Sequence, residues 1–187
     1  LSLFCKHISL NTDPNNLISS TNSSGEPFTF DSDSFLDSLK IFCLRNRYTI
    51  PQYVQCTASF TDFVSNKFDF KFHGLFSEKT LEEFCHYICI KENFNIFTGS
   101  PISFDHNKLW NHFTSLCSRK SFKLSLDSSK AINLFKTYIS SKIPCTDTKI
   151  FLDETLIGFY QNFKDILTND TDKVFISRLD GSCLELD

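Results

Sequence analysis

The sequence predicts an α+β fold in which a mixed, mostly antiparallel sheet packs against about five amphipathic helices. Three observations lead to this fold class. Five stretches repeat apolar residues at helical spacing, one stretch alternates phenylalanine with polar residues as a strand does, and the two kinds of segment do not alternate regularly along the chain. The 187 residues suffice for one hydrophobic core, and no linker-like break follows residue 31, so we expect a single domain over 1–187.

The N-terminal part of the chain is predicted to contain strands and one long loop. Residues 1–10 are typical of a strand, and the Pro, Gly, Ser and Asn residues of 11–31 predict a mobile loop. Two further strands are expected at 48–60 and 67–74. In the second of these, phenylalanines face one side and charged residues and a histidine face the other, which is the pattern of a sheet with one solvent-exposed face.

Each of the five predicted helices begins at a side chain that can accept hydrogen bonds from the free backbone N–H groups of the first turn. These capping residues are Ser34, Ser77, Asp105, Asp127 and Asp153. The expected buried face of the first helix consists of Phe35, Leu36, Leu39, Phe42 and Cys43. Short strands are expected at 122–126, 149–152, 174–177 and 183–186. The pair Asp180-Gly181 predicts a hairpin turn between the last two.

Phenylalanine dominates the composition, with 22 residues against 5 tyrosines, 1 tryptophan and no methionine. Most phenylalanines recur at helix or strand periods, so they indicate packing more than chemistry. The excess of Phe over Tyr is also typical of a thymine-rich coding strand, which favours a viral or parasite source.

Composition and charge exclude several classes of function. The five glycines cannot be arranged into GxGxxG or GxxxxGK[ST], so a phosphate-cradling loop is not expected. The net charge of −3 argues against general attraction to nucleic acids or anionic lipid. No apolar run approaches the roughly 18 residues that span a bilayer, so no membrane partner is expected.

The first candidate site is the sequence Asp69-Phe70-Lys71. A carboxylate and a lysine two residues apart on a strand point to the same side, where the carboxylate can hold a divalent metal and the lysine can orient water. Asp62 offers a second carboxylate. The order helix, strand, strand with Asp-x-Lys, helix over 34–97 resembles the core of PD-(D/E)xK nucleases, although no proline precedes Asp62. The resemblance implies phosphodiester cleavage with Mg²⁺ or Mn²⁺, with Asp62 and Asp69 as metal ligands and Lys71 as a third catalytic residue.

The second candidate is a pair of triplets, His7-Ile8-Ser9 and His112-Phe113-Thr114. Two such triplets resemble the signature of 2H phosphoesterases, which implies that His7 and His112 act as acid and base on a phosphodiester. The second triplet lies within a predicted helix, where residues two apart do not share a face.

The chain has eight cysteines, which permit a disulfide framework without requiring one at this length. Cys43, Cys85 and Cys117 fall on the apolar faces of predicted helices, where a thiol packs as a small hydrophobic group. These positions favour a reducing compartment such as the cytoplasm.

Together these observations favour a non-enzymatic protein-interaction module, such as an effector, adaptor, immunity-type or assembly protein, that needs no cofactor. The chain contains no strong catalytic motif and has more aromatic residues than one core needs. We therefore expect it to bind a protein partner, or a second copy of itself, through an apolar aromatic patch. The alternative is a phosphodiester-cleaving enzyme of either kind described above.

Overall fold

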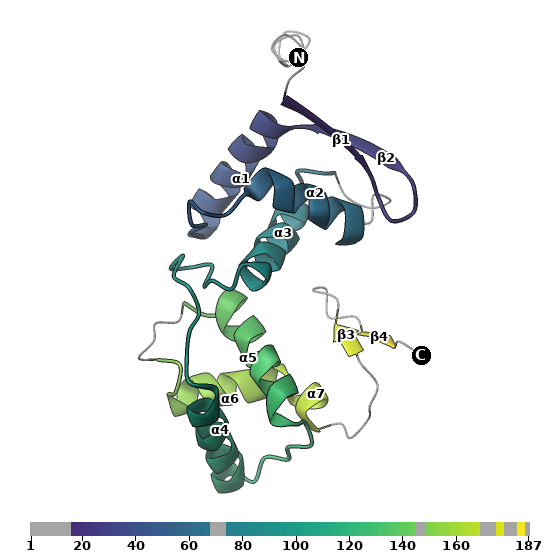
Figure 1. The fold of residues 1–187 in the computed structure, drawn as a ribbon. Helices are drawn as coiled ribbons and strands as arrows, with labels where there is room; N and C mark the ends of the chain where they lie inside the picture. Colours follow the sequence, from purple (N-terminus) through teal and green to yellow (C-terminus); the bar gives the residue numbers. More distant parts are fainter. Residues whose placement is uncertain (1–15, 68–73, 145–148, 169–174, 178–182, 186–187) are drawn as a thin grey trace. The chain divides into compact units, whose positions relative to one another are not determined.

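The α+β class is confirmed by the computed structural model, which describes residues 16–67, 74–144, 149–168, 175–177 and 183–185 (Figure 1). This part of the chain contains seven helices, more than the five expected, and its strands form two separate antiparallel hairpins. The chain divides into two compact units, Leu1–Ile88 and Cys89–Asp187. Helix α3 (Glu78–Lys91) runs through the boundary between the units. The organisation of 1–187 as a single domain stays a prediction.

The first unit begins with a hairpin where the sequence predicted a mobile loop. Strands β1 (Leu17–Thr21) and β2 (Pro27–Asp31) pair antiparallel, and the turn between them is closed by the Asn22 side chain, which accepts from the backbone of Glu26 at 2.8 Å. Phe28 and Phe30 point into the core from alternate positions of β2. The loop prediction for 11–31 is therefore wrong over the hairpin, because two buried rings outweigh the polar composition. Residues 11–15 lie outside the described residues.

Two helices, α1 (Ser32–Asn46) and α2 (Cys56–Lys67), pack beside the hairpin (Figure 1). Helix α1 begins earlier than predicted, because Asp31 rather than Ser34 is the cap and accepts from the Ser34 backbone at 2.7 Å. The strand predicted at 48–60 is wrong, because 48–55 runs as turns or irregular backbone and helix α2 covers the remaining five residues. The buried residues of α2, Phe60, Phe63 and Val64, have helical spacing. The predicted strand ended at residue 60 and so included only the first of the three.

The strand predicted at 67–74 is not tested over most of its length. Lys67 is the last residue of α2, and residues 68–73 lie outside the described part of the chain. Helix α3 follows after Ser77, which caps it as predicted by accepting from the Thr80 backbone at 3.2 Å.

The interior of the first unit is built from phenylalanine rings. Phe35 and Phe60 stack with centroids 4.1 Å apart, and Phe84 of α3 meets Phe60 edge-on at 5.1 Å. Phe30 of the hairpin also meets Phe60 edge-on, at 5.2 Å. These are the two favoured geometries of aromatic pairs, so the rings link strand and helices through one cluster.

The second unit contains the remaining helices and the second hairpin. Its elements are α4 (His106–Lys120), α5 (Ser128–Ser141), α6 (Asp153–Asn162), α7 (Lys164–Thr168), β3 (Phe175–Ser177) and β4 (Cys183–Glu185). Asp105 and Asp127 cap α4 and α5 as predicted. Asp153 is instead the first residue of α6, after Leu152 at the cap position, which makes no side-chain hydrogen bond to the helix.

The last two predicted strands are confirmed within shorter bounds, with β3 pairing antiparallel to β4, while the turn predicted at Asp180-Gly181 lies outside the described residues. The strands predicted at 122–126 and 149–152 are wrong, because both segments run as turns or irregular backbone. The first is held by single contacts, such as the bond from the Ser125 backbone to the Leu167 carbonyl at 2.8 Å, and has no strand beside it to pair with in the described residues.

The core of the second unit is a second aromatic cluster around Phe159 of α6. Phe135 meets this ring edge-on at 5.1 Å, and Phe113 lies against it at 5.2 Å. The buried amide of Asn95 donates to the carbonyls of Ile139 and Ile143, the latter at 2.8 Å, and so satisfies the open end of α5. The chain leading into α4 is thereby fixed to α5.

Three helices end in the same way, although none of them has a glycine at the end. Arg47, Asn93 and Ser121 adopt left-handed backbone with φ of 57°, 56° and 55°. In each case the next N–H reaches back to a carbonyl of the last turn, as Phe122 does to Cys117 at 2.8 Å. This Schellman motif satisfies the final carbonyls, but it places a side chain where glycine is favoured.

Candidate functional site

Only one of the three predicted nuclease residues lies in the described part of the chain. Asp62 is exposed on helix α2, and it therefore does not belong to the strand or turn that a PD-(D/E)xK core would require. Asp69 and Lys71 lie outside the described residues. Whether the three side chains converge stays a prediction.

The second predicted phosphoesterase triplet lies on helix α4, as its apolar spacing indicated. His112 is exposed, and its Nδ1 lies 3.0 Å from the Lys108 carbonyl of the same helix. The Thr114 hydroxyl donates to the Trp110 carbonyl at 2.9 Å. Both polar side chains are thus engaged with carbonyls of their own helix, and the pairing of His112 with His7 stays a prediction. His7 lies outside the described residues.

Among the described residues, no group of three or more His, Cys, Asp or Glu side chains could hold a metal ion. Within the same residues, no helix is long and apolar enough to cross a bilayer.

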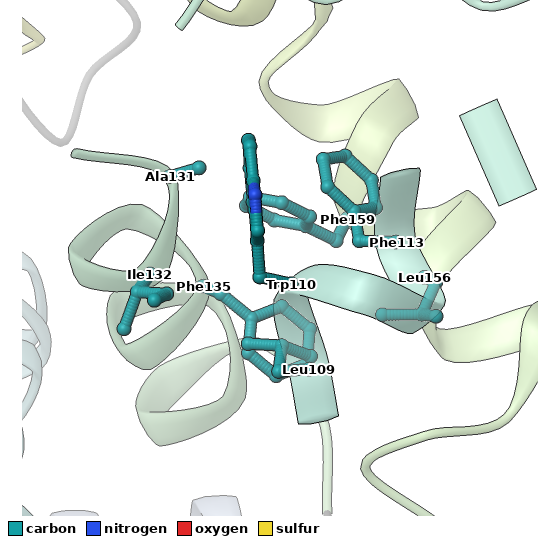
Figure 2. Close-up of a pocket in the computed structure, with 8 residues that line it drawn as sticks. All are labelled: Leu109, Trp110, Phe113, Ala131, Ile132, Phe135, Leu156 and Phe159. Atoms are coloured by element: carbon teal, nitrogen blue, oxygen red, sulfur yellow. The ribbon is translucent and has the colours of Figure 1, made fainter. Parts of the chain in front are cut away.

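A small pocket lies inside the second unit, between α4, α5 and α6. Figure 2 shows the Trp110 indole among its apolar neighbours, with Ile132 on one side of the view and Phe113 and Phe159 on the other. The free volume is about 10 Å³, near the lower limit for one water molecule, and every lining side chain is apolar apart from the indole N–H. This pocket is a packing feature and is too small for a ligand.

The most distinctive surface is the outer side of helix α1. Leu36, Ile41 and Leu44 are exposed at 40 %, 51 % and 73 %, while Phe35 and Phe42 on the opposite side are buried. We call these three exposed side chains the α1 outer face. The prediction that Leu36 belongs to the buried face of this helix is wrong. The signal it missed is that Leu36, Ile41 and Leu44 fall outside the three- and four-residue series that begins at Phe35.

Charges along α1 are divided between its two halves. The exposed acids Asp33 and Asp37 lie in the first half, whereas the exposed bases Lys40 and Arg45 lie in the second. Arg45 also forms an exposed ion pair with Glu78 at 3.6 Å.

The phenylalanines contribute less to this surface than expected. Every phenylalanine within 16–67, 74–144 and 149–168 is buried or half-buried, and the exposed large apolar side chains of these segments are aliphatic except for Tyr53. The half-buried rings still reach the surface in places, as at Phe151, where the Lys108 ammonium lies 4.8 Å from the ring centroid.

Two thiols lie close together between α1 and α3. The sulfur atoms of Cys43 and Cys85 lie 3.9 Å apart, with Cys43 half-buried and Cys85 fully buried. The hydrogen bond between them lowers the pKa of Cys43. Burial instead raises the pKa of Cys89 to about 12 and that of Cys117 to about 11.

Comparison with protein-family models, with curated proteins and with solved structures finds no match to the chain. The α1 outer face and the Cys43–Cys85 pair are therefore argued from their geometry alone.

Proposed function

We propose that the chain is a non-enzymatic protein-binding module that docks through the α1 outer face. The observation that carries this proposal is the exposure of Leu36, Ile41 and Leu44 on a helix whose other side already fills the core. Their exposed apolar surface is not needed for folding, and covering it gives a favourable free energy of about 25 cal/mol per Å². A cluster of exposed aliphatic side chains between charges is typical of a contact surface.

The charge pattern of α1 favours a second copy of the same chain as the partner. A two-fold axis across the helix would place two α1 helices antiparallel. The acidic half with Asp37 would then face the basic half with Lys40 of the other copy, and each half would meet its opposite charge. The apolar residues Leu36, Ile41 and Leu44 would lie between the helices.

Static light scattering over a wide range of concentrations tests the docking face. We expect the apparent mass of the wild-type chain to rise with concentration, and the variant Leu36→Ser/Leu44→Ser to stay at the monomer mass. Because both leucines are exposed, the variant should unfold as cooperatively as wild type, with only a small fall in the unfolding midpoint when both proteins are monomeric. Asn111→Ser/Ser118→Ala, which changes exposed polar residues of α4, is the matched control and should behave like wild type.

A charge exchange tests the antiparallel arrangement separately. Asp37→Lys and Lys40→Asp should each weaken self-association, because each places like charges opposite one another. An equimolar mixture of the two variants should associate again as a heterodimer. If neither single variant weakens association, or if the mixture fails to recover it, the antiparallel arrangement is wrong. If the wild-type chain is monomeric at every concentration, self-docking itself is wrong.

The competing hypothesis is phosphodiester cleavage, and it has its own assay. The purified chain is incubated with RNA or DNA, with and without Mn²⁺ or Mg²⁺. Cleavage that is lost in Asp69→Ala would support the metal-dependent alternative, and cleavage lost in His7→Ala would support the metal-free one. Either result would replace the non-enzymatic proposal.

A further inference from the structure

The thiol pair of the first unit has the arrangement of an oxidisable site. Cys43 on α1 and Cys85 on α3 place their sulfur atoms 3.9 Å apart, although 42 positions separate the two residues in the chain. A disulfide bond needs about 2.05 Å between the sulfurs. The two atoms must therefore approach by roughly 2 Å, a distance comparable to the arc that a thiol sulfur covers when its side chain rotates.

Contacts on either side of the two thiols hold α1 and α3 together. The Phe35 ring of α1 meets the Phe84 ring of α3 edge-on at 5.6 Å. Arg45 on the same helix pairs with Glu78 at 3.6 Å. The pair of thiols is thus presented by packed secondary structure and does not depend on a chance encounter of loops.

The two cysteines differ in access, which divides the roles between them. Cys43 is half-buried and is the more accessible residue of the pair, whereas Cys85 is fully buried. The lowered pKa of Cys43 agrees with this division, because the thiolate is the attacking form.

We propose that Cys43 and Cys85 are a reversible redox modification site that closes to an intramolecular disulfide on reaction with a small-molecule disulfide such as oxidised glutathione. The Cys43 thiolate attacks one sulfur of the reagent, breaks its S–S bond and releases one small thiol. The Cys85 thiol then loses its proton and attacks the Cys43 sulfur of the mixed disulfide, which releases the second small thiol. Two electrons pass from the two protein thiols to the reagent, and two protons end on the released thiols.

The closed disulfide joins α1 to α3 and encloses α2 in a covalent loop. Such a loop restricts the unfolded chain, so oxidation should raise the unfolding temperature of the first unit. This inference is independent of the proposed docking face, since it concerns the side of α1 that faces α3.

The test is oxidation of the folded full chain with oxidised glutathione, followed by peptide mapping without reduction. We expect a Cys43–Cys85 cross-linked peptide, a mass loss of about 2 Da for the two hydrogens removed, and reversal by dithiothreitol. The same oxidation in guanidinium chloride is the control, because the unfolded chain should not favour this pair. Cys56→Ser should leave the cross-link unchanged, which separates the pair from the other half-buried thiol among the described residues of this unit.

Two outcomes would overturn the proposal. One is a stable glutathione adduct on Cys43 without loss of the second glutathione, which would show that Cys85 does not reach it. The other is a cross-link that joins Cys43 to a different cysteine in the folded chain. Both are read from wild-type protein, so neither depends on whether Cys85→Ser folds.

Discussion

The rings of Phe35 and Phe60 stack 4.1 Å apart with an interplanar angle of 18°, and both side chains are fully buried. Replacing Phe35 with alanine removes this stack and leaves a cavity between α1 and α2. We expect Phe35→Ala to lower the free energy of unfolding by about 3–5 kcal/mol. Urea denaturation followed by circular dichroism measures the change.

The neighbouring residue is the control for this prediction. Leu36 lies on the same helix but is 40 % exposed, so in monomeric protein Leu36→Ala should lower the free energy of unfolding by about 1 kcal/mol, well below the loss at Phe35. Equal effects at the two positions would contradict the burial pattern of α1.

Gly158 of α6 lies directly against Tyr138 of α5. A methyl group at this position would come 2.5 Å from the Tyr138 hydroxyl oxygen, closer than such atoms approach. Alanine gains about 1 kcal/mol in helix propensity over glycine, but overpacking costs about 1–3 kcal/mol. We therefore expect Gly158→Ala to destabilise the protein, as measured by its unfolding midpoint.

Removing the Tyr138 hydroxyl tests whether it causes the destabilisation expected for Gly158→Ala. In a Tyr138→Phe background the clash is relieved, so Gly158→Ala should become neutral or stabilising when compared with Tyr138→Phe alone. A penalty of the same size in both backgrounds would exclude the hydroxyl as the cause.

Ser121 ends α4 with a left-handed backbone, φ 55°, and its side chain is exposed. A non-glycine residue in left-handed backbone is destabilised by about 1–2 kcal/mol. Replacing it with glycine removes this strain, but glycine also makes the unfolded chain more flexible, which offsets part of the gain. We expect Ser121→Gly to raise the free energy of unfolding by about 0.5–1 kcal/mol. Ser121→Val should lower it, because β-branched residues tolerate this backbone poorly.

The thiols should react with iodoacetamide in an order set by their pKa values. The hydrogen bond with Cys85 lowers the pKa of Cys43, while burial raises that of Cys56 to about 11 and that of Cys89 to about 12. At mildly alkaline pH, below these raised pKa values, Cys43 has the largest thiolate fraction of the three cysteines. Raising the pH should reduce the difference in alkylation rate between Cys43 and the other two. Time-resolved peptide mapping of the folded protein should show Cys43 alkylated first. If Cys89 were labelled before Cys43, the packing around both thiols would be contradicted.

The helices show how far sequence reasoning reached. Ser77, Asp105 and Asp127 are caps that could be recognised because capping depends on a side chain and a backbone only three residues away. The hairpin at 17–31 was missed because Phe30 packs against rings as far along the chain as Phe60 and Phe76, contacts that no local window contains. Composition alone therefore predicted a loop.

The candidate surface was harder to predict for a related reason. The exposure of Leu36 depends on which side of α1 the core occupies, and an apolar residue on either side fits a helical pattern. The proximity of Cys43 to Cys85 depends on tertiary packing across 42 positions, so no spacing rule could reveal it. The helix ends at Arg47 and Asn93 were equally hidden, because the usual glycine signal is missing there.

Helix α3 has a practical consequence for dividing the protein into fragments. The compact units meet between Ile88 and Cys89, yet the helix continues to Lys91 and is closed by the turn at Asn93. A cut between the units would sever an intact helix next to two fully buried side chains and leave the last carbonyls of the first-unit fragment without the N–H groups that donate to them. A recombinant piece intended to preserve the first unit should therefore retain the chain through Asn93.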